Sequence, residues 1–402
     1  MSKMNFSDKN EGKKSAADIE VEDDFDDDDD DGYKEPENKK KLILVLAIPF
    51  IVIAVVVIFL FIIMSFAGGN RSFEEIEEIM VVAAESYFKD HPESLPKSDG
   101  GTQTIDASTL AAEGRMKPLA EYNETMCTGQ VKVFKSGANY LYVPKLECGE
   151  AYKFQALHEK VREDNPIVSS GYGLHNKNGN YVFRGETVNN YVKLDNATWR
   201  IVKIASGNQL VLVLDKAISS PQPWDDRYNQ DMSYNAGINN FGTSRIKEYL
   251  EHLYNTKDSG IVSILLSDRD KTRMVSYNFC TGKRGPNETG VEQAVECREV
   301  TRNQKLGLLT AADFMNASVD PNCTKASSET CQNYNYLITD YAWWLATASS
   351  ANTYSAYMVE QNAGIEMKNV NMYTRIRPVI YLNSEVAYKG GTGTQEDPYT
   401  VK

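Results

Sequence analysis

The stretch Trp199–Leu214 reads WRIVKIASGNQLVLVL and contains two runs rich in β-branched and aliphatic residues. Between them stands Ser206-Gly207-Asn208, whose residue types favour a tight turn. Two such runs joined by a short polar turn predict an antiparallel hairpin. This hairpin is the clearest structural signal in the chain.

Strand-like runs continue on both sides of this hairpin. Upstream, Tyr181–Arg184 and Tyr191–Leu194 are separated by a polar turn, and together with the hairpin they predict an antiparallel meander. Further strands are predicted downstream at Trp343–Ala348 and Arg377–Leu382, with a last edge strand after the turn Gly390–Gly393.

Two helices interrupt the predicted strands. The segment Ser244–Tyr254 places Ile246, Leu250 and Leu253 on one face, as an amphipathic helix does. A second helix follows Thr310, which forms a capping box with Asp313 three residues later. Strands mixed with a few helices predict the α+β class for residues 171–402.

An apolar segment near the N-terminus predicts a transmembrane helix. Residues 42–67 contain no charge, and at 1.5 Å per residue they exceed the ~30 Å thickness of the hydrocarbon core. Lys39–Lys41 precede the segment, whereas Arg71 stands alone after it, so we expect a cytoplasmic N-terminus and an extracellular C-terminus. The alternative is a signal peptide cleaved near Ser65–Ala67, but signal peptides have an apolar core of only about 7–15 residues.

The preceding residues 1–41 form an acidic tail. They hold 15 acidic residues against 8 lysines, with six consecutive aspartates at Asp26–Asp31. A segment with so few aliphatic residues has little to bury and is predicted to be disordered. It is interpreted as a solvated arm or, alternatively, as a docking tail for a basic partner. The net charge of −13 over the whole chain argues against nucleic-acid binding.

All six cysteines lie beyond the apolar segment, on the predicted extracellular side. An even number in an oxidising compartment predicts three disulfides. Fifteen connectivities are possible, and pairing of sequence neighbours is the simplest. A zinc site is the alternative, but the chain has no CxxC motif. The neighbour pairs are Cys127–Cys148, Cys280–Cys297 and Cys323–Cys331.

Residues 68–150 predict a small domain with a long helix and a sheet. Apolar residues recur at helical spacing from Phe73 to Tyr87, and His91-Pro92 ends that pattern. Two strands, Gln130–Phe134 and Tyr140–Val143, lie between Cys127 and Cys148. A disulfide between these cysteines would clamp the open end of the hairpin.

The sequence pattern of residues 42–150 resembles that of type IV pilins and pseudopilins. The resemblance rests on Tyr87–Pro92, Leu110, Gly114 and Cys127–Val131 after the apolar segment. It implies a membrane-emergent helix packed on a small sheet. Pilins carry a leader ending in glycine and a glutamate within the apolar helix. In this chain Lys39–Lys41 directly precede Leu42, and the apolar segment contains no glutamate. We therefore interpret residues 68–150 as a pilin-like stalk and not as a pilin. A linker is predicted at residues 151–170.

The distal part is similar to a second group, surface proteins of low-GC Gram-positive bacteria. Their C-terminal domain belongs to the sulfatase-modifying, C-type-lectin-like class, and its match here covers about residues 170–402. The resemblance implies an α+β fold with two helices and long loops; fold alone does not settle function. The matching segments are Tyr181–Glu186, Tyr191–Lys193, Trp199–Val202, Gly307–Thr310, Trp343–Thr347, Arg377–Leu382 and Gly390–Tyr399.

Motifs for catalysis are weak. None of the four histidines stands in a metal-binding motif, and no metal or cofactor is predicted. Ser244 and Lys247 form Ser-x-x-Lys, the spacing of penicillin-recognising enzymes, but no Lys-Thr-Gly strand follows, so Ser244 is interpreted as a helix N-cap. Each cysteine has a predicted disulfide partner, so the sequence offers no candidate for the reactive thiol that formylglycine-generating enzymes use.

The candidate binding residues are Trp224, Asp225 and Asp226. An exposed aromatic ring beside two carboxylates would suit sugar stacking and calcium binding, whereas a buried loop anchor is the alternative for Trp224. We therefore expect a non-catalytic, membrane-anchored cell-surface binding protein that contacts a cell-wall glycan or a surface protein. The alternatives are a structural pilin-like assembly or secretion component and an ectoenzyme.

Overall fold

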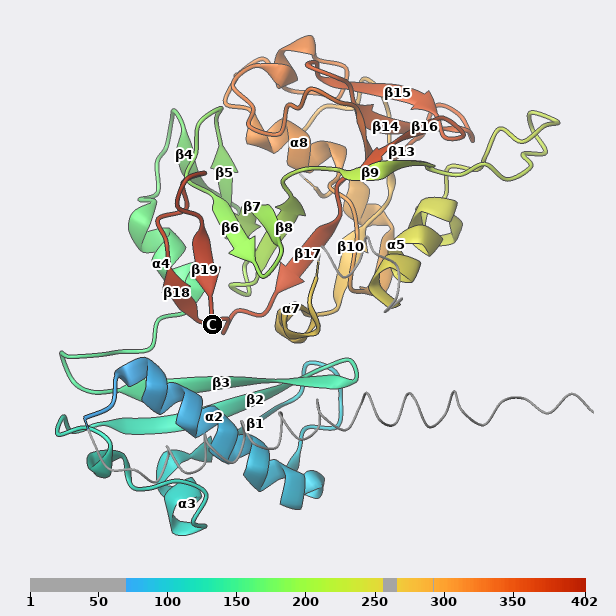
Figure 1. Cartoon of the computed structure of the whole chain (residues 1–402). Coiled ribbons are helices and arrows are strands. Elements are labelled where there is room, and N and C mark those ends of the chain that lie inside the picture. Colours follow the sequence, from blue (N-terminus) through green and yellow to red (C-terminus); the bar gives the residue numbers. More distant parts are fainter. Residues whose placement is uncertain (1–69, 256–265, 292) are drawn as a thin grey trace, which may run out of the picture. The chain divides into compact units, whose positions relative to one another are not determined.

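The structure is a computed structural model that describes residues 70–255, 266–291 and 293–402 (Figure 1). Its mixture of several sheets with a few helices confirms the predicted α+β class. The predicted acidic tail (1–41) and transmembrane helix (42–67) lie outside the described residues. Among the residues that are described, no helix is long and apolar enough to cross a membrane.

The elements of the described ranges are mostly short. The helices are α2 (Phe73–Asp90), α3 (Ala107–Ala112), α4 (Leu157–Asp164), α5 (Arg245–Asn255), α7 (Asp268–Arg273) and α8 (Ala311–Ala317). The strands of the N-terminal part are β1 (Thr102–Asp106), β2 (Thr128–Ser136) and β3 (Asn139–Glu147). Those that follow are β4 (Gly173–Lys177), β5 (Asn180–Arg184), β6 (Tyr191–Leu194), β7 (Ala197–Ile204), β8 (Leu210–Leu214), β9 (Ile218–Pro223), β10 (Tyr277–Cys280), β11 (Lys283–Arg284), β12 (Val300–Gln304), β13 (Trp343–Ser349), β14 (Ser355–Val359), β15 (Ile365–Asn369), β16 (Tyr373–Ile376), β17 (Val379–Leu382), β18 (Tyr388–Gly390) and β19 (Tyr399–Val401).

In the N-terminal part, helix α2 packs on the antiparallel sheet β1–β2–β3 (Figure 1). The helix begins at the capping box of Ser72 and Glu75, and it ends at His91, as the sequence predicts. Its apolar stripe is buried, including Met80. Gly129 on β2 lies against this stripe, and a Cβ atom there would lie 2.7 Å from Met80 Cε, so a larger residue would require the flexible Met80 side chain to shift.

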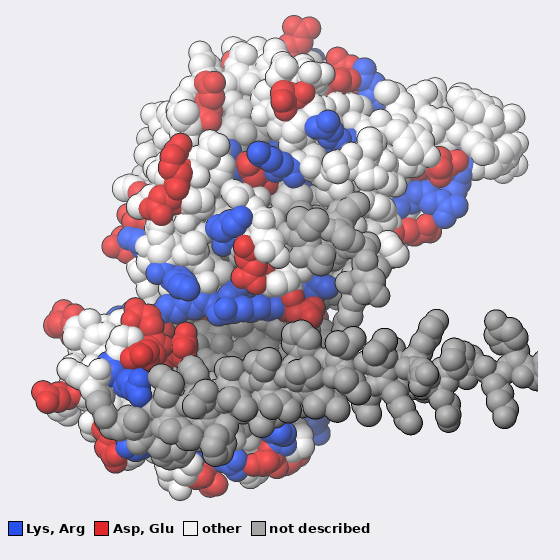
Figure 2. All heavy atoms as spheres, in the orientation of Figure 1, with Lys and Arg blue, Asp and Glu red and all other residues white. Residues whose placement is uncertain are grey.

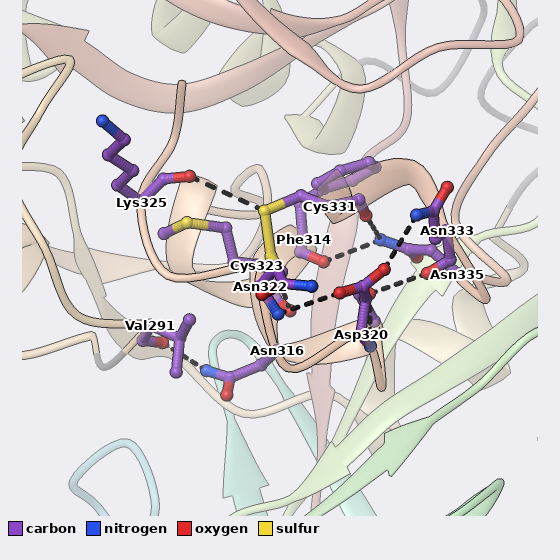
Figure 3. Close-up of a disulfide and its surroundings, with 12 residues drawn as sticks. Val291, Phe314, Asn316, Asp320, Asn322, Cys323, Lys325, Cys331, Asn333 and Asn335 are labelled. Atoms are coloured by element: carbon purple, nitrogen blue, oxygen red, sulfur yellow. Dashed lines mark hydrogen bonds between the residues drawn. A yellow bond between two sulfur atoms is a disulfide. The ribbon is translucent and has the colours of Figure 1, made fainter. Parts of the chain in front are cut away.

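The three neighbour disulfides predicted from the sequence are present. Cys127–Cys148 joins the residues that flank the β2–β3 hairpin, whose register pairs Thr128 with Glu147. Cys323–Cys331 closes a short loop after α8 (Figure 3). Beside this disulfide, the Asn335 side chain donates hydrogen bonds to the carbonyls of Phe314 and Cys331, which ties the loop to α8.

The largest sheet contains the predicted hairpin of β7 and β8 and follows the order β17–β8–β7–β6–β19–β18. The predicted meander is wrong in one respect, since β5 and β6 each pair with β7 and not with each other. Strand β7 is eight residues long, and β6 takes its first half while Tyr181 of β5 pairs with Ile204 at its end. Strand β19 is not an edge strand, because it lies between β6 and β18.

A second sheet follows the order β15–β14–β13–β16–β9, with β11 beside β13. Its central strand β13 is buried along its whole length, and both Trp343 and Trp344 lie in the core. The core also includes Leu157 and Val161 of α4. Helix α4 lies within the predicted linker at residues 151–170, and these two side chains show that part of this linker packs against the distal core.

Candidate functional site

Trp224 is fully buried, so its predicted role as an exposed sugar-stacking ring is wrong. Its indole Nε1 donates a hydrogen bond to the carbonyl of Leu345, 2.9 Å away, and its ring meets Phe241 edge to face. The residue directly follows β9 and stands at the start of the long loop between β9 and α5. Trp224 is therefore the loop anchor that the sequence offered as the alternative.

Asp225 is also fully buried, and its carboxylate is occupied by protein donors. It accepts hydrogen bonds from the backbone N–H groups of Arg227, Ile238 and Arg245, and it forms an ion pair with Arg227. Asp226 is partly exposed and lies 3.6 Å from the Arg245 guanidinium. These partners leave Asp225 no open coordination position, which corrects its predicted role in ligand binding. Nowhere in the described ranges do three or more His, Cys, Asp or Glu residues form a cluster that could hold a metal ion.

The loop that Trp224 and Asp225 anchor is the segment 225–240, which we name the tyrosine loop. It projects from the domain beyond the end of β9 (Figure 1). Gly237 has a φ of +77°, and a Cβ atom there would lie 2.1 Å from the Asp225 carbonyl oxygen, so only glycine fits. Its N–H donates to the Arg227 carbonyl, which closes the loop at its base.

Two asparagines hold the tyrosine loop from inside. The Asn229 amide donates to the Gly237 carbonyl at 2.6 Å, and its backbone N–H donates to the Tyr234 carbonyl. Asn239 is buried, and its amide donates to three carbonyls that precede or belong to β14, while its oxygen accepts from Lys283. Buried polar groups that are satisfied in this way fix one conformation. The loop is therefore preorganised.

The outer surface of the tyrosine loop carries exposed aromatic side chains. Tyr228 is 58% exposed and Tyr234 is 47% exposed. Tyr373, the most exposed tyrosine among these at 65%, stands at the start of β16 and pairs with Pro223 at the base of the loop. A hydrogen bond from Asn371 to the Asn235 carbonyl joins the turn before β16 to the loop. Figure 2 shows this projection as a surface with few charged side chains.

The sequence-based prediction named Trp224 and its two neighbours and missed these tyrosines, because no local pattern shows which of the side chains are exposed. The signal that could have found the two loop tyrosines is the composition of residues 228–240, YNQDMSYNAGINN, which contains two tyrosines, four asparagines, one serine and one glycine. That mixture is the one that antibody binding loops use, since tyrosine supplies contact area at a low cost in conformational entropy. Only Asp231 in this stretch is charged. The predicted binding residues 224–226 therefore lie a few residues before the exposed tyrosines of the loop.

The Ser-x-x-Lys motif takes part in helix capping. Ser244 Oγ donates to the Phe241 carbonyl and accepts from the Lys247 backbone N–H, which is the geometry of an N-cap at α5. The Lys247 ammonium lies 2.7 Å from Glu251, one turn further along. The hydroxyl and the ammonium are thus each engaged with other groups.

Comparison with known proteins adds no family to this picture. No protein-family model matches the chain, and neither a curated protein nor a solved structure matches it.

Proposed function

We propose that this chain is a membrane-anchored, non-catalytic cell-surface binding protein whose tyrosine loop docks into a concave surface of another protein. The observation that carries the proposal is a pair of exposed tyrosines, Tyr228 and Tyr234, on a loop held by the buried side chains of Asp225 and Asn229. Exposed Tyr373 stands beside the base of this loop, at the start of β16. Tyrosine is enriched at protein interfaces because its ring buries a large area while its hydroxyl remains satisfied.

The shape of the site favours a macromolecular partner. Small molecules bind in concave sites that surround them, whereas a projecting loop offers contact area only to a surface that surrounds the loop. The fixed backbone lowers the entropic cost of docking, because the loop is already ordered before it meets its partner. Aromatic anchors on a preordered loop therefore support protein recognition more than recognition of a free sugar.

The proposed location rests on the sequence. The apolar residues 42–67 are long enough to span a bilayer, and Lys39–Lys41 favour a cytoplasmic N-terminus. With this orientation the cysteines and the tyrosine loop are extracellular, and the three disulfides fit an oxidising compartment.

The two resemblances supply the proposed architecture. A helix packed on a three-stranded sheet with a disulfide across its hairpin is compatible with the pilin-like stalk. The mixed sheets and long loops of the distal part are compatible with the C-type-lectin-like class. In this arrangement the stalk carries the distal domain away from the membrane, and the tyrosine loop meets the partner.

Site-specific photo-cross-linking in the native host tests the proposal. A photoreactive phenylalanine derivative replaces Tyr228 or Tyr373 in the full-length chain, and adducts are detected on intact cells by denaturing electrophoresis. We expect one discrete adduct of the same mass from both positions, since both side chains would lie within one interface.

Tyr172 and Tyr334 provide the matched control. They are exposed to a similar degree, 41% and 52%, and their ring centroids lie 6.1 Å apart, so they form an aromatic pair outside the tyrosine loop. The proposal requires that the discrete adduct be absent when the photoreactive group stands at either control position. The same adduct from all four positions, or none from the loop positions, would overturn it.

A further inference from the structure

A cavity of about 200 Å³ lies in the distal part, formed by residues other than those of the tyrosine loop. At ~30 Å³ per water molecule in the liquid, this volume equals roughly seven waters. It therefore fits a small organic group. Strands β7, β8 and β17 contribute one side of the lining, and the residues before and within α8 contribute another. The side chains that the argument uses are Lys203, Val211, Phe279, Gln293, Leu308 and Asp313.

A network of four polar side chains lies in the lining: Lys203, Thr310 and Asp313 are buried, and Gln293 is partly exposed. The Lys203 ammonium is 2.9 Å from Asp313 Oδ1 and 2.7 Å from Gln293 Oε1. The Gln293 amide nitrogen donates to the same Asp313 oxygen. The other oxygen of Asp313 accepts from the backbone N–H and the hydroxyl of Thr310, which is the capping box of α8. Asp313 is thus fully engaged.

Lys203 has one hydrogen-bond donor more than this network uses. An ammonium group carries three N–H donors, and Lys203 is only 6% exposed. Within the part of the chain that the structure describes, Gln293 and Asp313 are its two acceptors. A buried donor without an acceptor costs free energy, so a side chain that lines a cavity in this state favours a ligand with an acceptor oxygen.

The part of the lining around Cys280 and Cys297 is held in place by covalent and ionic links. The Cys280–Cys297 disulfide contributes both of its residues to the lining. Next to it, Arg284 and Glu296 are both fully buried and form a bidentate ion pair, with distances of 2.7 and 2.8 Å. A cavity with walls fixed in this way does not need to be opened by its ligand.

The charge balance selects a neutral ligand. Burial alone raises the pKa of Asp313, but Lys203 and the Thr310 hydrogen bonds outweigh it and lower that pKa below its usual value. Asp313 is therefore ionised at neutral pH and balances Lys203. Among the described lining residues Lys203 is the one cation, so a ligand carboxylate would place a second anion beside it in a largely buried site, which is unfavourable. A neutral carbonyl oxygen accepts the free N–H without that cost.

We propose that the cavity binds an acetamido group, with its carbonyl oxygen on the Lys203 ammonium and its methyl group against the apolar lining. Val211, Leu308 and Phe279 supply that apolar surface. The ligand class is a small N-acetylated compound, either an N-acetyl sugar or an N-acetylated peptide. This site is independent of the tyrosine loop, so one site can fail its test while the other passes.

Ligand-detected NMR with the full-length chain tests the proposal. The neutral probes are N-acetyl-D-glucosamine and N-acetyl-L-alanine methylamide, which separate the two sources. D-glucose lacks the acetamido group, and acetate carries the charge that the site should reject. We expect at least one acetamido probe to bind at least tenfold more tightly than both D-glucose and acetate.

Two variants locate the binding. Ser206→Tyr narrows the cavity mouth at an exposed lining residue, so its folding should be unaffected, and it should weaken binding of the acetamido probe at least tenfold. Ser170→Tyr is the matched control, an exposed serine outside the lining that should bind as the parent does. Lys203→Met should abolish binding if it folds. Absence of acetamido binding, equal binding of acetate or D-glucose, or binding unaffected by Ser206→Tyr would overturn the proposal.

Discussion

The Asp225 carboxylate accepts a hydrogen bond from the backbone N–H of Ile238, 3.0 Å away and thirteen residues further along the chain. The same oxygen accepts from the Arg227 N–H, so one buried carboxylate joins the two ends of the tyrosine loop. Hydrogen bonds to a charged group are about twice as strong as neutral ones. The loop that carries the proposed recognition surface is therefore shaped by a residue that no partner can reach.

Trp224→Ala should lower the free energy of unfolding by about 3–5 kcal/mol, since it empties a fully buried tryptophan site. Chemical denaturation of the full-length chain measures this change. Trp224→Phe keeps most of the ring and loses the hydrogen bond to Leu345, so a smaller loss of about 1–3 kcal/mol is expected. A stable Trp224→Ala variant would contradict the assignment of this residue as an anchor.

Replacing Cys127 and Cys148 by serine should lower stability by about 3 kcal/mol, because the disulfide closes a loop with a sequence separation of 21. Cys323 and Cys331 are separated by only 8 residues, and the same chain-entropy argument gives them about 2.5 kcal/mol. Denaturation midpoints of the two double variants check the order. A larger loss at the shorter loop would show that local packing outweighs loop closure.

The parts of the fold that sequence predicted are local. Apolar periodicity located α2 and α5, and the caps Ser244 and Thr310 marked the starts of α5 and α8, because both kinds of signal lie within a few residues of the helix. The three disulfides were also predicted correctly, because each one joins cysteines that are neighbours in the sequence. Pairing of β5 and β6 with one strand was missed, since two short strands can share the length of β7 and no local signal reports this.

The candidate sites depend on distant residues and were harder to predict. Trp224 is buried by Leu345 and Phe241, and nothing near it in the sequence shows that burial. The cavity joins Lys203 to Asp313 across 110 residues. A lysine within a strand pattern has the appearance of a solvated side chain until its partner is known. The composition of the tyrosine loop indicates residue types that are common at interfaces, but it does not show which side chains are exposed.

Asp313→Asn should lower the free energy of unfolding by about 3 kcal/mol at pH 7, because it leaves Lys203 buried without its carboxylate. The folded-state pKa of Asp313 lies below the ordinary value of 3.8, so the carboxylate stabilises the fold above that value. This contribution is lost as the pH falls through the folded-state pKa.

The measurement is the free energy of unfolding of parent and variant from pH 7 down to about pH 3. The difference between the two proteins should stay constant down to about pH 5 and then narrow as the pH falls. Titration of other carboxylates affects both proteins alike and is removed by subtraction. A difference that does not change over this range would contradict the ionised pair.

Protease added to protoplasts should remove the chain beyond about Arg71 and leave an N-terminal fragment detectable by an N-terminal tag. The expectation follows from Lys39–Lys41 before the apolar segment and the single Arg71 after it. Lysed protoplasts provide the control, in which the tag should be digested as well. Protection of the distal domain in intact protoplasts would contradict the proposed orientation.

The central claim is that the tyrosine loop is the recognition surface. Its most direct measurement is the affinity of the full-length chain for the protein cross-linked at Tyr228 and Tyr373, compared with the triple variant Tyr228→Ser, Tyr234→Ser and Tyr373→Ser. At about 1–2 kcal/mol for each interface tyrosine, the triple variant should bind at least 100-fold more weakly. Its stability should stay near that of the parent, since the side chains are exposed. The double variant Tyr172→Ser and Tyr334→Ser should keep the parent affinity, and an unchanged affinity of the triple variant would contradict the account.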